Sequence, residues 1–174
     1  MLTRGLAALY RAAGVLAGVF LVAICVIVCA QIVARQLDTI IPSADQFAGF
    51  CLAATSFLGL AWSFRGGSHI RVTLFTRALR GPAHRLMMML ALAIGSAITG
   101  LLAWHTVAMV IQNFARSEVT SGLVPVPIWL PQSGMAIGLV LFAVAMIEDL
   151  VRVILGYDPI FEDGEENPTE NGEP

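Results

Sequence analysis

The sequence contains no lysine, and its charged residues are scarce wherever its hydrophobic residues are dense. All ten basic residues are arginine, and charged residues make up 13% of the 174 residues, against 57% that are hydrophobic. That balance excludes an intrinsically disordered chain and is not typical of a soluble globular domain. Aspartate, glutamate and arginine are absent from four long apolar runs, which cover residues 12–34, 47–64, 86–111 and 128–147.

Each apolar run has the length of a membrane span. A transmembrane helix needs roughly 20 apolar residues to cross a hydrocarbon core of about 30 Å, and a soluble helix of that length would show a polar face. The sequence therefore predicts an all-α integral membrane protein with four transmembrane helices, forming one domain over residues 1–155. Residues 156–174 hold seven acidic residues and no basic one, which predicts a disordered cytoplasmic tail.

The positions of the arginines predict how the chain is oriented. Two of them, Arg35 and Arg116, lie in the first and third loops, and the other eight lie near the termini or in the second loop. Because cytoplasmic loops carry the excess of basic residues, both termini and the second loop are predicted to be cytoplasmic. In that loop, residues 70–80 place apolar and basic side chains at helical spacing, which predicts an amphipathic segment lying in the membrane interface.

The apolar runs lack the groups that chemistry inside a membrane requires. Ion carriers and proton relays keep ionisable residues within the bilayer, and a haem anchor needs axial ligands, usually paired histidines. We expect His105 to be a hydrogen-bonded residue near the periplasmic interface, and Cys25, Cys29 and Cys51 to be small buried hydrophobic residues. No catalytic, metal-binding, phosphate-binding or nucleic-acid-binding pattern is recognised, so we do not expect an enzyme.

Small residues recur four positions apart in three of the runs. Such spacing lets two helices approach closely, either within the chain or against another subunit, and the sequence leaves both open. A membrane protein with packing surfaces and no embedded chemistry is typical of an accessory subunit. The pairs are Gly14 and Gly18, Ser96 and Gly100, and Gly134 and Gly138.

Motifs at the ends of the runs point to a family. They are Gln31–Arg35, Asp45, Trp62–Val72 with its Arg-x-Gly-x-His-Ile-Arg-Val string, and Pro127–Gln132 followed by Gly138. In these motifs, and over about residues 9–155, the chain resembles the small transmembrane subunit (Q component, DctQ-type) of tripartite ATP-independent periplasmic (TRAP) transporters. The candidate structural and interface residues are Arg35, Asp45, Arg65, Gly67, His69, Arg71, Trp129, Gln132, Gly134 and Gly138.

The resemblance implies a part in a three-component importer of the bacterial inner membrane. A periplasmic binding protein would deliver an organic acid to a large permease subunit, which would carry the substrate and sodium sites. The small subunit would pack against the large one as scaffold in the lipid bilayer, with no cofactor of its own and no nucleic-acid partner. The identity of the substrate is not implied.

Two other functions remain as alternatives from the residues alone. One is a membrane anchor subunit of a respiratory haem or quinone complex, and the other is an independent small four-helix transporter. A further hypothesis concerns Arg35 and Asp45, which end the first run and open the second. Because a charge at membrane depth needs a partner, these two side chains are predicted to form an ion pair.

Overall fold

Four helices make up the part of the chain that the computed structural model describes, which is residues 2–65 and 82–156. They are α1 (Leu2–Gln36), α2 (Ala44–Arg65), α4 (Pro82–Ala115) and α5 (Trp129–Leu155). Each predicted apolar run lies within one of them, except that Ile128 is the residue before α5. The all-helical prediction is confirmed for these ranges, where β-pairing is limited to one isolated bridge between Val119 and Pro127.

Two predicted segments lie outside the described residues. They are the amphipathic segment 70–80 and the acidic tail beyond Gly156.

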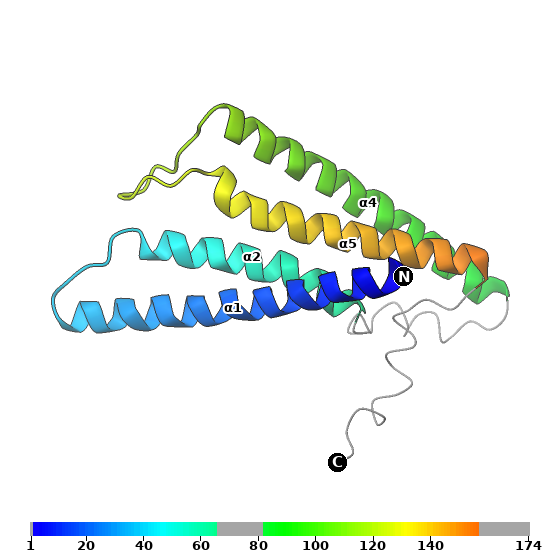
Figure 1. Ribbon diagram of the computed structural model, residues 1–174, viewed down its shortest axis with the longest axis horizontal. Helices are drawn as coiled ribbons and strands as arrows, with labels where there is room; N and C mark the ends of the chain where they lie inside the picture. The colour runs from blue at the N-terminus through cyan, green and yellow to red at the C-terminus, as the bar shows by residue number, and fades with distance from the viewer. Residues whose placement is uncertain (1, 66–81, 157–174) are drawn as a thin grey trace, which may run out of the picture.

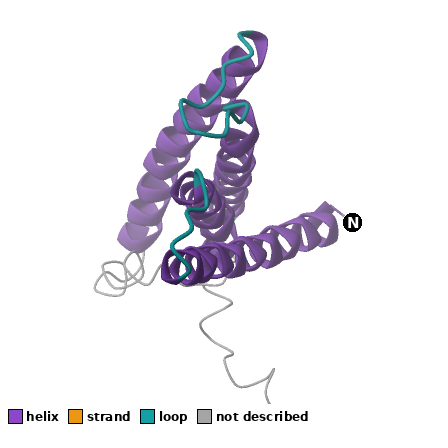
Figure 2. Cartoon of the chain, turned by 90° about the vertical axis from the view of Figure 1, so that its left-hand side faces the viewer, coloured by secondary structure: helices purple, strands orange, loops and turns teal. Residues whose placement is uncertain are grey.

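The helices are arranged in the order α1, α2, α5, α4, so that the last helix of the chain lies inside the bundle. Helix α1 packs on α2, α2 packs on α5, and α5 packs on α4. Side chains of all four helices meet in one core cluster towards the end where α1 and α4 begin, which we call the charged end. The opposite end holds the loops 37–43 and 116–128, and we call it the hairpin end; there the α1–α2 pair spreads apart from the α4–α5 pair (Figure 1; Figure 2 views the hairpin end).

Three of these helices are long and apolar enough to cross a membrane. They are the segments Gly5–Gln36, Ala44–Arg65 and Arg85–Ala115. Their outward surfaces are rich in exposed hydrophobic side chains, such as Val15, Ile94 and Trp104. Surfaces of this kind suit a hydrocarbon environment.

Helices α1 and α4 end in the same way at the hairpin end. The Thr39 N–H donates to the Ala34 carbonyl at 2.9 Å, and Asp38 between them adopts the left-handed conformation, with φ of 52°. The same pattern of bonds closes α4 around Ser117, whose φ is also 52°. Both ends are Schellman motifs, which satisfy carbonyl groups that a helix terminus leaves without an intrahelical partner.

The main core lies towards the charged end, where the helices converge. The rings of Phe64 and Phe142 meet edge to face there, with centroids 5.4 Å apart. Such a contact adds to the stabilisation from burying the rings. The buried residues of this cluster are Tyr10, Ala61, Phe64, Met88, Leu92, Phe142, Ala145 and Val153.

Glycine decides how closely α2 and α5 approach. A Cβ atom added at Gly138 would lie against the backbone of Phe57 and 2.7 Å from the backbone nitrogen of Leu58, which is closer than real Cβ contacts. One at Gly134 would lie 3.2 Å from the Cβ of Ala54. The Gly134–Gly138 pair therefore packs against α2 within the chain, which is one of the two uses that the sequence left open.

Candidate functional site

An ion pair lies between α2 and α5 at the charged end. Arg65, the last residue of α2, donates a hydrogen bond from Nη2 to Oε2 of Glu148 on α5. The two side chains are only 15% and 19% exposed. Because removing one member of a buried pair strands the other charge, this contact constrains how α2 and α5 meet.

Helix α1 joins the same site through an aromatic ring. The guanidinium carbon of Arg65 lies 4.4 Å from the centre of the Tyr10 ring. Tyr10 is 1% exposed, and its hydroxyl has no hydrogen-bond partner among the described residues. A cation over an aromatic face is stabilised by the ring's negative face, so Arg65 holds three helices together.

Two further charged residues of α5 belong to this end. Asp149 is 2% exposed, and Arg152 is partly buried one turn further on. Both have interaction partners. With Arg65 and Glu148 they bring together two positive and two negative formal charges, and such balance is what burial of charged groups requires.

Arg85 fixes the start of α4 to the end of α5. Its Nη2 atom donates to the carbonyl of Val153 at 2.9 Å and reaches that of Ile154 at 3.4 Å. Helix α5 ends at Leu155 and is capped by Gly156, whose φ of 94° is left-handed. A cation that caps the last carbonyls of a helix also offsets the negative end of its dipole.

Tyr10, Glu148 and Asp149 were not predicted from the sequence, because Tyr10 lies just before the first apolar run and the two carboxylates lie just after the fourth. The usable signal was the apolar pattern that resumes after them, from Leu150 to Leu155. Two carboxylates flanked on both sides by apolar helix are more typical of a buried position than of a helix terminus. Arg65 was predicted, but its partner was not.

At the hairpin end, Asp45 pairs with a different residue from the one predicted. Its Oδ1 atom accepts a hydrogen bond of 2.9 Å from Nε2 of Gln31. Among the described residues no ion pair joins Arg35 to Asp45, and Arg35 is exposed. The predicted pair is wrong because Gln31, one turn before Arg35 on α1, is the residue that faces the first turn of α2.

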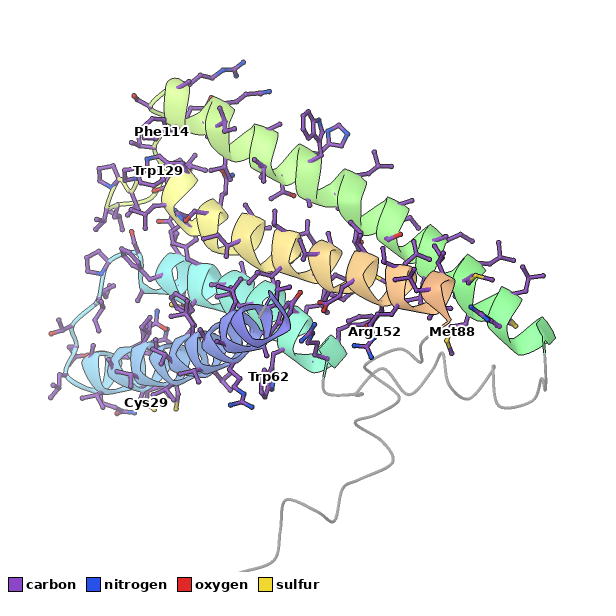
Figure 3. All side chains as sticks on the ribbon, turned by 45° about the vertical axis from the view of Figure 1, so that its right-hand side comes forward. Cys29, Trp62, Met88, Phe114, Trp129 and Arg152 are labelled. Carbon is purple, nitrogen blue, oxygen red and sulfur yellow. The ribbon has the colours of Figure 1, made fainter. Side chains whose placement is uncertain are left out.

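The other predicted residues of this end, Trp129 and Gln132, tie α4 to α5. Asn113 donates from Nδ2 to Oε1 of Gln132 at 2.7 Å. The rings of Phe114 and Trp129 meet edge to face, with centroids 5.4 Å apart (Figure 3). Both contacts join the end of one helix to the start of the next.

A single hydrogen bond crosses between the two loops of the hairpin end. The Val124 N–H donates to the Ser43 hydroxyl at 3.1 Å. Beside it, the side-chain oxygen of Gln46 is buried without a hydrogen-bond partner in the described part of the chain, close to Gly122. The two loops are therefore joined by a neutral hydrogen bond rather than by an ion pair.

Several residues singled out for chemistry lie on outward surfaces. His105 is exposed on α4 and makes no hydrogen bond among the described residues, contrary to the prediction. Cys25 and Cys29 are exposed on α1, and Cys51 is half-buried. The prediction of buried cysteines is wrong for α1 because this edge helix packs mainly against α2.

Three predicted residues, Gly67, His69 and Arg71, lie outside the described residues. Within the described ranges, no group of three or more histidine, cysteine, aspartate or glutamate side chains is arranged to hold a metal ion.

The described structure defines a class: a helical membrane protein whose buried charges gather at one end and brace its helices. The family model for the DctQ component of tripartite ATP-independent periplasmic transporters matches residues 24–156, and the chain belongs to this family. It is thus a small permease subunit of a TRAP transporter, a multi-pass inner-membrane protein from a family of transport components rather than enzymes. No curated protein and no solved structure matches the chain.

Proposed function

We propose that this chain is the scaffold of a sodium-driven TRAP importer, packed against a large permease subunit that carries the substrate and sodium sites. A periplasmic binding protein would deliver an organic acid to that subunit. The observation that carries the proposal is the family membership together with the place of the buried charges. Arg65, Glu148 and Asp149 lie at the bundle end, where the Arg65–Glu148 ion pair joins α2 to α5.

The proposal includes a fourth membrane span. Helix α5 has 27 residues, which corresponds to about 40 Å at 1.5 Å per residue, more than the roughly 30 Å of a hydrocarbon core. Residues 133–147 carry no charge. As α5 lies between α2 and α4, a membrane that contains its neighbours would also contain it.

The proposal also places the charged end in the cytoplasm. Arg65, Arg85 and Arg152 lie at that end, whereas Arg35 and Arg116 lie at the hairpin end. The excess of arginine favours the cytoplasmic side. Single cysteines at Gln36 and Ser121, labelled in intact cells with a membrane-impermeant maleimide in a background without native cysteines, should react. If both cysteines reacted only after the cells were opened, the orientation would be the opposite of the one proposed.

Transport in proteoliposomes tests the function itself. Vesicles would hold the large subunit with or without this chain, and the binding protein would be loaded with the organic acid that it retains on purification. We expect sodium-dependent uptake only when this chain is present. The variant His105→Gln should keep both the sodium dependence and the substrate preference. A shift in either would make this chain part of the transport pathway and overturn the scaffold assignment.

A further inference from the structure

The outer face of α5 carries a narrow stripe of side chains of one kind. From Ile137 to Ile154 every exposed residue of this helix is β-branched, with 38–59% of each residue accessible. The remaining residues of that segment are buried or half-buried. We call these six residues the α5 stripe: Ile137, Val140, Val144, Ile147, Val151 and Ile154.

The spacing of the α5 stripe is that of a helix-packing seam. Its members follow one another at intervals of three, four, three, four and three residues, a repeat of about 3.5 residues. Such a repeat drifts around a straight helix by about 20° per heptad in the left-handed sense, so that a second helix crossing at about +20° follows it over its whole length.

The residue type points the same way as the spacing. Isoleucine and valine are stiff at χ1 in a helix, so they lose little rotamer freedom when another helix covers them. Helix α5 contacts its neighbours within the chain through other residues. Gly138 faces α2, and Leu139 packs with Ala103 of α4. The β-branched residues of this segment are therefore concentrated on the face that no part of the described chain covers.

Helix α1 shows what an unspecialised apolar surface looks like in this protein. It packs mainly against α2, and most of its circumference is exposed. Its exposed residues include Leu16, Gly18, Leu21, Val22 and Cys25, which vary in size and branching and spread around the helix. The α5 stripe differs because it is both narrow and uniform.

An open apolar groove continues the α5 stripe towards the hairpin end. It has a volume of about 410 Å³, and α1, α2 and α5 all contribute to its walls. Its lining includes Leu16 and Phe20 of α1, Ala54 of α2, and Leu130 and Ile137 of α5. Ile137 belongs to both the groove and the stripe, so the two form one continuous surface.

We propose that the α5 stripe and this groove together seat one transmembrane helix of the large permease subunit, an inference that rests on the proposed function. The occupant would be an apolar helix with its own 3–4 spacing of apolar residues. It would place a bulky apolar side chain in the groove, where an unfilled space forfeits the contacts that close packing supplies. Specificity would come from shape, because no charge lines the surface.

Photocrosslinking in the assembled complex tests this assignment. Benzoylphenylalanine would replace Val140, Val144 or Val151 on the stripe, one at a time. Matched control positions are Ile98 and Leu101 on the outer face of α4, which are 54% and 62% exposed. Complexes would be purified through a tag on the large subunit and irradiated in lipid nanodiscs.

We expect the stripe positions to give a covalent product with the large subunit at least roughly tenfold more often than the α4 positions. Crosslinks to lipid alone from the stripe in an intact complex would overturn the inference while leaving the proposed function standing. Equal crosslinking from both faces would also overturn it. Failure of the two subunits to purify together would instead remove the proposed function on which it rests.

A second measurement tests the inference without benzoylphenylalanine, whose bulk could disturb the fold. The double variant Val144→Ala/Ile147→Ala should dissociate from the large subunit about tenfold faster than the wild type, because cavities form at the seam. The matched double variant Ile98→Ala/Leu101→Ala should dissociate at the wild-type rate. Identical rates for the two double variants would contradict a seat on α5.

Discussion

The two ends of the bundle are held by different kinds of contact. At the charged end, Arg65 contacts Glu148 and the Tyr10 ring, so that one side chain joins α2, α5 and α1. At the hairpin end, single hydrogen bonds rather than an ion pair join neighbours in pairs, α1 to α2 from Gln31 to the Asp45 carboxylate and α4 to α5 from Asn113 to Gln132. A buried ion pair tolerates few arrangements, whereas a single hydrogen bond that water can replace contributes less to stability.

The comparison explains the shape of the molecule. The α1–α2 and α4–α5 pairs meet where the buried ion pair and its aromatic neighbour join them, and they spread apart where the contacts are local (Figure 1). The spreading opens the apolar groove between α1 and α5. One end thus holds three helices together through a buried ion pair and an aromatic ring, and the other leaves an apolar groove open.

The largest expected effect comes from breaking the ion pair of the charged end. Glu148→Ala should lower the free energy of unfolding by about 3–5 kcal/mol, because it strands the partly buried Arg65. Thermal unfolding of the purified protein in detergent, followed by size-exclusion chromatography, measures the loss. The double variant Arg65→Met/Glu148→Leu should recover most of it, since two apolar side chains leave no charge uncompensated. A single variant as stable as the wild type would show that the pair contributes nothing.

The next effect tests the close approach of α2 and α5. Gly138→Ala should destabilise the chain by about 1–3 kcal/mol, because the added Cβ meets the backbone of Phe57 and Leu58 and forces the helices apart. Gly100→Ala is the matched control, as its added Cβ has nothing within 4 Å. The same unfolding assay applies, and equal effects at both positions would argue against the close crossing.

A smaller effect is expected at the hairpin end. Gln31→Ala removes the hydrogen bond to Asp45 and should cost about 0.5–1.5 kcal/mol. Hydrogen exchange of the 37–45 segment is the sharper measurement, because the loss should be local. Arg35→Ala should leave that exchange unchanged. If Arg35→Ala raised it as much as Gln31→Ala, the ion pair expected from the sequence would regain support.

The smallest effect is expected for the exposed pair of Arg116 and Glu118. Their closest atoms are 3.7 Å apart, and the side chains are 69% and 44% exposed. An exposed pair of this kind contributes about 0–1 kcal/mol, so Glu118→Gln should leave the unfolding temperature within the error of the assay. A loss as large as that of Glu148→Ala would remove the contrast between the two ends.

Much of the helical architecture was predictable because long charge-free runs admit few alternatives in a membrane. The helix positions, the membrane class and the family all follow from such runs and from the motifs at their ends, among them Arg65 and Gln132. The choice of partners was not predictable in the same way. Gln31 and Arg35 both lie near the end of α1, one helical turn apart. Only the rotation of α1 against α2 decides which of them meets Asp45.

The sequence alone determined that the chain forms apolar helices, because hydrophobic runs and charge placement are local properties that each residue carries with it. Only the tertiary structure decided that α5 lies between α2 and α4 and that Gly138 packs within the chain. It also decided that Tyr10, Arg65 and Glu148 meet, although the first and the last lie 138 positions apart in the sequence. Such contacts depend on how whole helices cross, and side-chain shape sets the crossing across several helices at once.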